Sequence, residues 1–202
     1  MIDLKKIKLP IKNEIDLFEK KFKESVSSDV ALIDKVMHYV IKRKGKQIRP
    51  IFVFLSAKLF GNISNSCNTA ASLIELLHTA TLIHDDVVDE SNLRRGVFSI
   101  NAVWKNKLAV LIGDFLLSKG LLLSVKNKEY KMLGIMSRAV EQMSEGELLQ
   151  MEKSRKLNVS EKDYYKIIRK KTASLISACC ESGAVASKQC DTVCEKMKLF
   201  GE

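Results

Sequence analysis

Residues 78–89 read HTATLIHDDVVD, and they close a long apolar helix pattern with three aspartates. At 100° per residue, Asp85 and Asp89 share one face of a helix and Asp86 lies beside them, so the three carboxylates are predicted to converge. Two carboxylates about 6 Å apart repel by about 3 kcal/mol at an effective dielectric constant of about 20, and no lysine or arginine lies within four residues. The pattern therefore predicts a bound cation.

Oxygen ligands favour Mg²⁺, which is usually held by one or two carboxylates together with the phosphates of a substrate. We therefore expect Asp85 and Asp89 to hold Mg²⁺ on a diphosphate, although a solvated helix end explains an isolated DDxxD run equally well. His78 lies two turns before Asp85 with Thr81 between them, which directs both toward the same predicted cavity. The competing interpretation of His78 is a neutral histidine packed against core leucines.

A strongly basic turn, KRKGKQIRP at residues 42–50, precedes the apolar helix pattern of residues 51–60. Proline suits the first helical position, so Pro50 is predicted to begin this helix. Lys46 and Arg49 then lie at a helix N-terminus, where free N–H groups and the helix dipole favour an anion. Alone, a basic loop is usually a solvated connection. Together with Arg94 and Arg95, it favours two polyanionic ligands that meet in one cleft.

The composition favours one all-helical domain. The 202 residues are 46% hydrophobic and include two prolines and nine glycines, and apolar residues recur at helical intervals without a competing strand pattern. Ser160 and Asp163 form a capping pattern that predicts a helix from there to Cys180. No apolar run reaches the roughly 18 to 20 residues that span a bilayer, so no transmembrane segment is predicted.

The net charge of +10 is typical of nucleic-acid-binding domains. The lysines are scattered, however, and residues 85–89 would repel a phosphate backbone, so no nucleic-acid partner is expected. A positive cavity would attract diphosphates instead. The five cysteines form an odd set without C-x-x-C pairs and follow no secretory signal, which indicates a reducing, cytoplasmic location.

The motifs resemble those of the trans-isoprenyl diphosphate synthases, the polyprenyl synthetase family, over nearly all 202 residues. The matching segments, in order, are Gly45–Pro50, His78–Asp89, Arg94–Gly96, Gly113–Asp114, Glu145–Gln150 and Lys171–Ala173. The resemblance implies an all-α bundle of the isoprenoid-synthase type around a central cavity. Residues 1–202 would form a single domain that corresponds to the N-terminal two-thirds of a family member.

The resemblance also implies the role of the acidic motif. Asp85 and Asp89, supported by Asp86, would hold Mg²⁺ on the diphosphate of an allylic substrate, which Arg94 and Lys171 would also contact. Ionisation of that substrate needs cations to stabilise the leaving diphosphate in a dry site.

Two further sets of residues follow from the resemblance. Thr172 would lie near the developing allylic cation, and Glu147 and Gln150, one helical turn apart, would line the cavity. Isopentenyl diphosphate, the second substrate, would be bound by Lys46, Arg49, His78 and Arg95.

The implied activity is the condensation of isopentenyl diphosphate with an allylic prenyl diphosphate by a homodimer, with apolar helices such as residues 108–123 at its interface. Ala80 and Thr81, five and four residues before Asp85, are small where the family places its chain-length pocket. They predict a long product, as in octaprenyl, heptaprenyl and solanesyl synthases. The alternative is a shorter farnesyl or geranylgeranyl product.

One feature departs from the family pattern. Family members carry a second aspartate-rich motif, usually after a Phe-Gln pair, and this chain ends at residues 199–202 near the start of the helix that leads to it. The resemblance therefore implies that the C-terminal helices are missing, and that this chain turns over slowly or not at all.

Two other functions remain as alternatives. A terpene cyclase shares the DDxxD run but has no use for the basic set Lys46, Arg49 and Arg95. An inactive partner subunit would suit the missing motif, although its aspartates would be expected to be degenerate, and Asp85 and Asp89 are intact.

Overall fold

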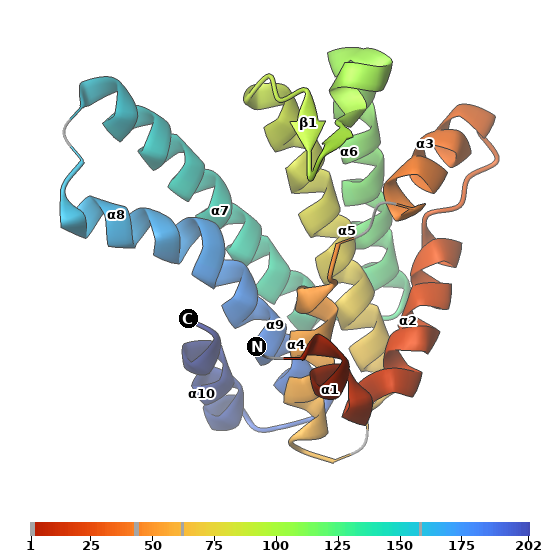
Figure 1. The fold of residues 1–202 in the computed structure, drawn as a ribbon. Coiled ribbons are helices and arrows are strands. Elements are labelled where there is room, and N and C mark those ends of the chain that lie inside the picture. The colour runs from red at the N-terminus through yellow and green to blue at the C-terminus, as the bar shows by residue number, and fades with distance from the viewer. Residues whose placement is uncertain (1–2, 43–44, 62, 158) are drawn as a thin grey trace.

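The computed structural model describes residues 3–42, 45–61, 63–157 and 159–202. Within these ranges the chain is almost entirely helical apart from a short β-hairpin (Figure 1), which confirms the all-α prediction. The elements are α1 (Leu4–Lys8), the 3-10 helix η1 (Leu9–Ile11), α2 (Lys12–Ser25), α3 (Ala31–Lys42), α4 (Ile48–Lys58), α5 (Asn65–Val88), β1 (Leu93–Arg94), β2 (Val97–Phe98), α6 (Ile100–Lys126), α7 (Tyr130–Lys156), α8 (Glu161–Ile168), the π-helical segment η2 (Arg169–Ala173), α9 (Ser174–Ala186) and α10 (Asp191–Gly201).

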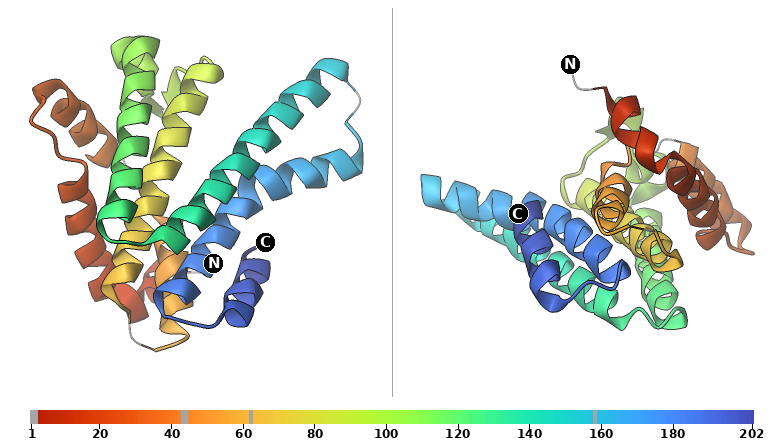
Figure 2. Two further views of the ribbon diagram at one scale, coloured as in Figure 1. Left: turned by 180° about the vertical axis from the view of Figure 1, so that it is seen from behind. Right: turned by 90° about the horizontal axis from the view of Figure 1, so that it is seen from below.

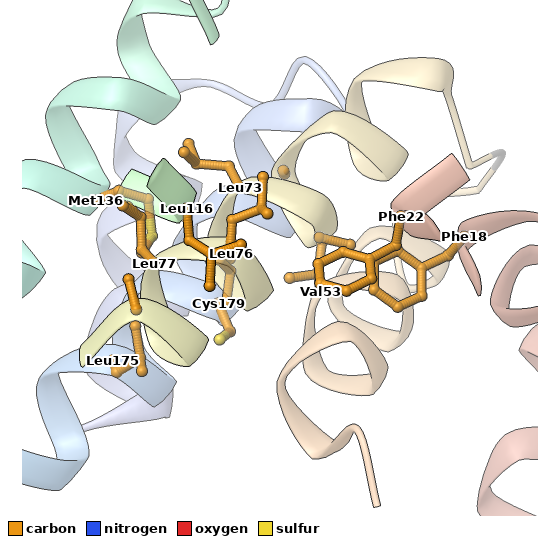
Figure 3. Close-up of a cluster of buried hydrophobic side chains, with 14 of the residues drawn as sticks. Phe18, Phe22, Val53, Leu73, Leu76, Leu77, Leu116, Met136, Leu175 and Cys179 are labelled. Carbon is orange, nitrogen blue, oxygen red and sulfur yellow. The ribbon is translucent and has the colours of Figure 1, made fainter. Parts of the chain in front are cut away.

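The central helix is α5, which is buried on nearly all sides over its first half and packs against α2, α4, α6, α7 and α9. Truncation of a fully buried leucine typically costs about 2–5 kcal/mol, so this packing fixes the place of the acidic end of α5. Figure 3 shows two groups of core side chains: Leu73, Leu76 and Leu77 of α5 with Leu116, Met136, Leu175 and Cys179, and Phe18 and Phe22 of α2 with Val53 of α4.

The backbones of α4 and α9 approach each other closely at Gly183. A Cβ atom at this position would lie 2.6 Å from the carbonyl oxygen of Val53 and 2.7 Å from the Cβ of Ser56, so only glycine fits. This contact holds α4 against the core. It also fixes the first turn of α4, which carries Arg49.

Helices α7 and α8 lean away from α5 and α6 toward the end of the molecule where α5 finishes (Figures 1 and 2). The predicted capping box is confirmed: Ser160 Oγ accepts from the backbone N–H of Asp163, and the Asp163 carboxylate accepts from the backbone N–H of Ser160. The helix continues through α8, η2 and α9 past Cys180, as predicted, but one turn of it is π-helical. A π-helical turn often marks a functional site.

Two local predictions need correction. The segment after the aspartates forms the antiparallel hairpin β1–β2, although no strand was predicted, because two-residue strands leave no periodic pattern. Helix α4 begins at Ile48, so Pro50 is its third residue, where its missing N–H still falls in the unbonded first turn. Within α6, Lys105 is non-helical, with φ of 71°, and marks a kink one residue after Trp104.

The prediction that no segment spans a membrane stays a prediction, although one helix is longer and more apolar than the sequence analysis expected. In the part of the chain that the structure describes, α6 is long and apolar enough to cross a membrane. Asp114 and Lys119 interrupt its apolar residues, which concealed the pattern from a search for an unbroken run. In the folded chain α6 packs along α5, and one-third of its apolar window is buried.

Candidate active site

The first turn of α4 forms one wall of the candidate site. Gln47 precedes the helix in the left-handed conformation, with φ of 54°, and its side chain is buried. Lys46 is exposed before this residue, and Arg49 follows within the first helical turn, as predicted. Arg43 and Lys44 of the predicted basic turn lie outside the described residues.

A cavity of about 420 Å³ lies between this turn, α3, α5 and the β1–β2 hairpin. It brings together residues that are up to 81 positions apart in the chain, from Glu19 to Ile100. Its remaining wall is largely apolar, with Phe22, Val40 and Ile83 among the lining side chains. All the residues that the sequence assigned to isopentenyl diphosphate line this one cavity, together with Arg94: Lys46, Arg49, His78 and Arg95.

The cavity wall carries unsatisfied polar groups. Arg49 Nε and His78 Nδ1 are buried, and neither has a hydrogen-bond partner among the described residues. Burial lowers the pKa of Arg49, but a guanidinium stays charged at neutral pH. Glu75 of α5 offsets part of the Arg49 charge, but a buried N–H group without an acceptor still costs about 1–3 kcal/mol. The site therefore favours a ligand that supplies the missing acceptors.

His78 is neutral in this cavity. Burial lowers the pKa of His78 to about 3, with further lowering by the charges of Arg49, Arg95 and Arg94. Its imidazole can therefore donate one hydrogen bond without adding a charge. The structure places His78 in the cavity with Asp86 rather than on the face of Asp85, so the prediction that His78 and Asp85 face one cavity is wrong in that detail.

The hairpin presents the two arginines at its turn. Arg95 and Gly96 both have positive φ, 54° and 76°, between the paired residues Arg94 and Val97, which is the signature of a type I′ turn. The Arg95 guanidinium packs on the backbone of Gly45, where a Cβ atom would clash with Arg95 Nη1. Gly45 therefore leaves the space that Arg95 occupies.

Asp86 does not join the other two aspartates. Arg94 Nε donates to both carboxylate oxygens of Asp86 at 2.8 and 2.9 Å, and Arg94 Nη2 lies 2.7 Å from Asp86 Oδ1. Asp86 is 5% exposed, and this pairing raises the pKa of Arg94. The predicted convergence of three carboxylates is therefore wrong, because a buried ion pair turns Asp86 toward the hairpin.

A second polar cluster lies on the other side of α5, between its end and α7 with η2. Burial raises the pKa of Asp85, and the carboxylates of Glu147 and Asp89 raise it further, against the opposing charges of Lys171 and Arg94. Lys171 Nζ lies 2.5 Å from Glu147 Oε2 and donates to Gln150 Oε1 at 3.1 Å. The structure therefore brings together the residues that the sequence placed around the allylic diphosphate.

This second cluster fits a two-carboxylate metal site. Among the described residues, no group of three or more histidine, cysteine, aspartate or glutamate side chains could hold a metal ion. Mg²⁺ needs fewer protein ligands, because it keeps waters and binds phosphate oxygens. Burial, and then the neighbouring carboxylates, raise the pKa of Asp85 and so disfavour its charged form, which a divalent cation would stabilise.

The remaining predicted residues lie near the same end of the bundle. Thr172 is exposed in η2, one residue after Lys171. Ala80 is buried in the core, and Thr81 is half-buried with its hydroxyl donating to the carbonyl of His78. Neither residue lines the 420 Å³ cavity, and their assignment to a chain-length pocket stays a prediction.

Two contacts in this region were not predicted. His84 Nε2 lies 3.3 Å from the carbonyl oxygen of Val110 and 3.5 Å from Asp114 Oδ1, over the space left by Gly113. The Tyr39 hydroxyl donates to the carbonyl of Phe98 at 2.6 Å. The Gly113–Asp114 motif was a signal for the first contact, whereas no sequence signal pointed to Tyr39.

Comparison with known proteins agrees with this geometry. Residues 30–202 match the family model described as Polyprenyl synthetase. Octaprenyl diphosphate synthase of Escherichia coli is 40% identical over 162 residues, which are 80% of this chain and 50% of that protein. Heptaprenyl diphosphate synthase component 2 of Bacillus subtilis is 33% identical over 95% of this chain and 55% of its own length. The chain thus spans about half the length of these curated relatives.

The fold is also that of solved relatives. A polyprenyl synthase from Caulobacter crescentus, solved in complex with calcium and isoprenyl diphosphate, has a TM-score of 0.93 and 34% identity, over 98% of this chain and 61% of that one. Decaprenyl diphosphate synthase from Rhodobacter capsulatus has a TM-score of 0.93 and 32% identity, over 98% of this chain and 62% of that one.

Proposed function

The chain belongs to the polyprenyl synthetase family, and from this premise we propose that it contributes both diphosphate sites of a prenyltransferase. The reaction condenses isopentenyl diphosphate with an allylic prenyl diphosphate to give a trans-polyprenyl diphosphate. The observation that carries the proposal is the pair of sites that flank the end of α5. One is a cavity in which, among the described residues, four cationic side chains, Lys46, Arg49, Arg94 and Arg95, outnumber three carboxylates, Glu19, Glu75 and Asp86. The other is an acidic cluster with one lysine.

The cavity is suited to isopentenyl diphosphate. Lys46, Arg49 and Arg95 supply positive charge around the diphosphate, and neutral His78 supplies a hydrogen bond. The adjoining apolar side chains, which include Phe22 and Ile83, offer a dry surface to a five-carbon chain. The cationic side chains of this cavity can bind the diphosphate directly. This site should therefore bind isopentenyl diphosphate without Mg²⁺.

The acidic cluster is suited to the allylic diphosphate. Bound Mg²⁺, held by Asp85 and Asp89, would neutralise the charge that develops on the leaving diphosphate. Lys171 would exchange its contacts with Glu147 and Gln150 for the same diphosphate, and Thr172 would face the allylic carbon. Asp86 would not bind metal directly but would hold Arg94 between the two sites.

The chemistry then needs no protein nucleophile. The carbon–oxygen bond of the allylic substrate breaks and leaves diphosphate and an allylic cation. The double bond of isopentenyl diphosphate attacks this cation to form the new carbon–carbon bond. A proton is then lost to the departed diphosphate, which regenerates a double bond and lengthens the chain by one isoprene unit.

We propose a long-chain product. The small side chains of Ala80 and Thr81 below Asp85 support this proposal, as do the octaprenyl and heptaprenyl names of the relatives. A shorter product is the alternative, because geranylgeranyl diphosphate synthase of Saccharolobus solfataricus is also 31% identical to this chain. Ala80→Phe should shorten the product distribution, and an unchanged distribution in a variant that keeps its fold would contradict the assignment.

We also propose a homodimer in the cytoplasm. Exposed apolar side chains on α6, with Leu111 at 55% and Leu122 at 52%, support pairing through this helix. All five cysteines are free thiols, as suits a reducing compartment. The component 2 name of the Bacillus subtilis relative favours one alternative, a subunit that works with a different partner chain.

Turnover is the direct test. The chain would be supplied with radiolabelled isopentenyl diphosphate, Mg²⁺ and each allylic primer, both alone and joined to the remaining C-terminal part of the Escherichia coli octaprenyl relative. We expect the joined protein to extend the primers and its Asp85→Ala variant to lose that activity. Retained turnover in the variant would refute the site assignment, and a folded joined protein that extends no primer would refute the function.

A further inference from the structure

The cavity has two walls that belong to different parts of the chain. Helix α3 contributes Tyr39, Val40 and Ile41, and the loop before α4 adds Gly45 and Lys46. The other wall is the β1–β2 hairpin with the start of α6, which contributes Arg94, Arg95 and the stretch from Val97 to Ile100. Because cations come from both walls, the spacing of the walls decides whether one diphosphate can reach all of them.

The hairpin wall is tied mainly to the end of α5 and to the loop that follows it. Ser99 Oγ donates to the carbonyl of Ser91 at 2.6 Å, and the Asn101 side chain donates to the carbonyls of Ser91 and Asp86. Arg94 adds its ion pair with Asp86. These bonds hold the base of the hairpin to the end of α5, but they do not reach α3.

Tyr39 connects the hairpin wall directly to α3. Its hydroxyl donates to the carbonyl of Phe98, the last residue of β2, at 2.6 Å. Its ring packs edge-to-face on Trp104 at the start of α6, with centroids 4.9 Å apart and an interplanar angle of 88°. The aromatic contact orients the ring, and the hydroxyl bond fixes the strand that leads back to Arg95.

We propose that Tyr39 is a positioning residue for diphosphate binding, which acts through the hairpin to hold Arg95 against Gly45 and opposite Lys46 and Arg49. This inference rests on the proposed function and deepens it. Arg95 is exposed and has φ of 54°, so its own turn gives it little support beyond Gly45. A strap from α3 to β2 supplies the rest.

The first test is Tyr39→Phe, which removes the hydroxyl bond and keeps the ring on Trp104. Calorimetric titration would measure the Kd of isopentenyl diphosphate without Mg²⁺ and the Kd of a non-ionisable allylic diphosphate with Mg²⁺. We expect about three- to tenfold weaker binding of isopentenyl diphosphate, because the ligand must then order the hairpin on binding. The allylic ligand should bind as before, and the lost bond should lower the melting temperature by no more than about 4 °C.

Tyr130→Phe is the matched control, because Tyr130 is 61% exposed at the start of α7 and far from the cavity lining. It should bind both ligands as the parent chain does. An unchanged Kd for isopentenyl diphosphate in Tyr39→Phe would overturn the inference. So would equal weakening of both ligands with a lowered melting temperature, because that pattern indicates a general structural role.

A double-mutant cycle tests the route through Arg95. If Tyr39 acts by placing Arg95, then Tyr39→Phe should have almost no further effect in an Arg95→Gln background, whereas additive losses would contradict the route. Titration with inorganic pyrophosphate separates this inference from the proposed function. A parent chain that binds pyrophosphate but not isopentenyl diphosphate would refute the substrate assignment, and the pyrophosphate Kd of Tyr39→Phe would still decide the role of Tyr39.

Discussion

The two sides of the last turn of α5 carry the same residue type under opposite conditions. On the cavity side, Asp86 is buried and neutralised by Arg94 through two hydrogen bonds. On the α7 side, Asp85 has a raised pKa, because burial and the carboxylates of Glu147 and Asp89 outweigh Lys171 and Arg94. One aspartate is therefore satisfied within the protein, and the other is left with an excess of negative charge.

This difference separates structure from ligand binding within one motif. A satisfied, buried ion pair holds the hairpin in place but has little left to offer a metal. An acidic group that its surroundings disfavour gains most from a bound cation. We therefore propose two functions for the three aspartates, which their spacing in the sequence does not reveal.

The largest expected effect is on stability at Asp86. Asp86→Ala removes a buried carboxylate from Arg94, but 36% of the Arg94 side chain is accessible, so water can partly replace the lost partner. We therefore expect the free energy of unfolding in urea to fall by about 2–3 kcal/mol. Asp89→Ala, at an exposed position, serves as the control and should stay within about 0.5 kcal/mol. Equal losses in the two variants would remove the distinction between the two sides of α5.

The pH dependence of stability should follow His78. Its pKa of about 3 in the folded chain lies below the unfolded value of about 6.5, so the unfolded state binds more protons between these values. The stabilisation is complete above pH 6.5 and is lost as the pH falls toward 3. Between pH 7 and pH 4.5, the free energy of unfolding in urea should therefore fall by about 2 kcal/mol less in His78→Gln than in the parent chain. Parallel losses would show that His78 is not held neutral by its surroundings.

The smallest effect concerns the contact between Lys171 and Glu147. The pair is partly exposed, with 37% and 25% of the side chains accessible, and such pairs contribute at most about 1 kcal/mol. Glu147→Gln should release Lys171 and strengthen metal-free binding of an allylic diphosphate by about two- to fivefold in calorimetry. Weaker binding would indicate that Glu147 helps to hold the ligand.

Sequence reasoning predicted which residues lie together at the end of α5, but not how they pair. The basic residues of the cavity were predicted because their motifs are local, and the structure places Lys46, Arg49, His78 and Arg95 around one space. The pairing of Asp86 with Arg94 was missed because it depends on a hairpin whose strands have only two residues each. The contact of Tyr39 was missed for a related reason. Its hydroxyl donates to the backbone carbonyl of Phe98, 59 residues further along the chain, and a backbone acceptor leaves no signal in the sequence.

The fold was predictable for similar reasons. Helical periodicity over long segments, with few glycines and prolines, gave the all-α class and the helix from Ser160 onward. Periodicity did not predict the start of α4 at Ile48 or the apolar length of α6, because both depend on single residues. The single-domain assignment stays a prediction.

The central claim is that the two sides of the end of α5 bind two different diphosphates, only one of them through metal. The most direct measurement is calorimetric titration of the Asp85→Asn and Arg49→Gln variants with isopentenyl diphosphate and with a non-ionisable allylic diphosphate, each with and without Mg²⁺. We predict that Asp85→Asn loses the Mg²⁺-dependent binding of the allylic ligand and keeps isopentenyl diphosphate, and that Arg49→Gln does the reverse. Equal loss of both ligands in both variants, or allylic binding that ignores Mg²⁺, would contradict the account.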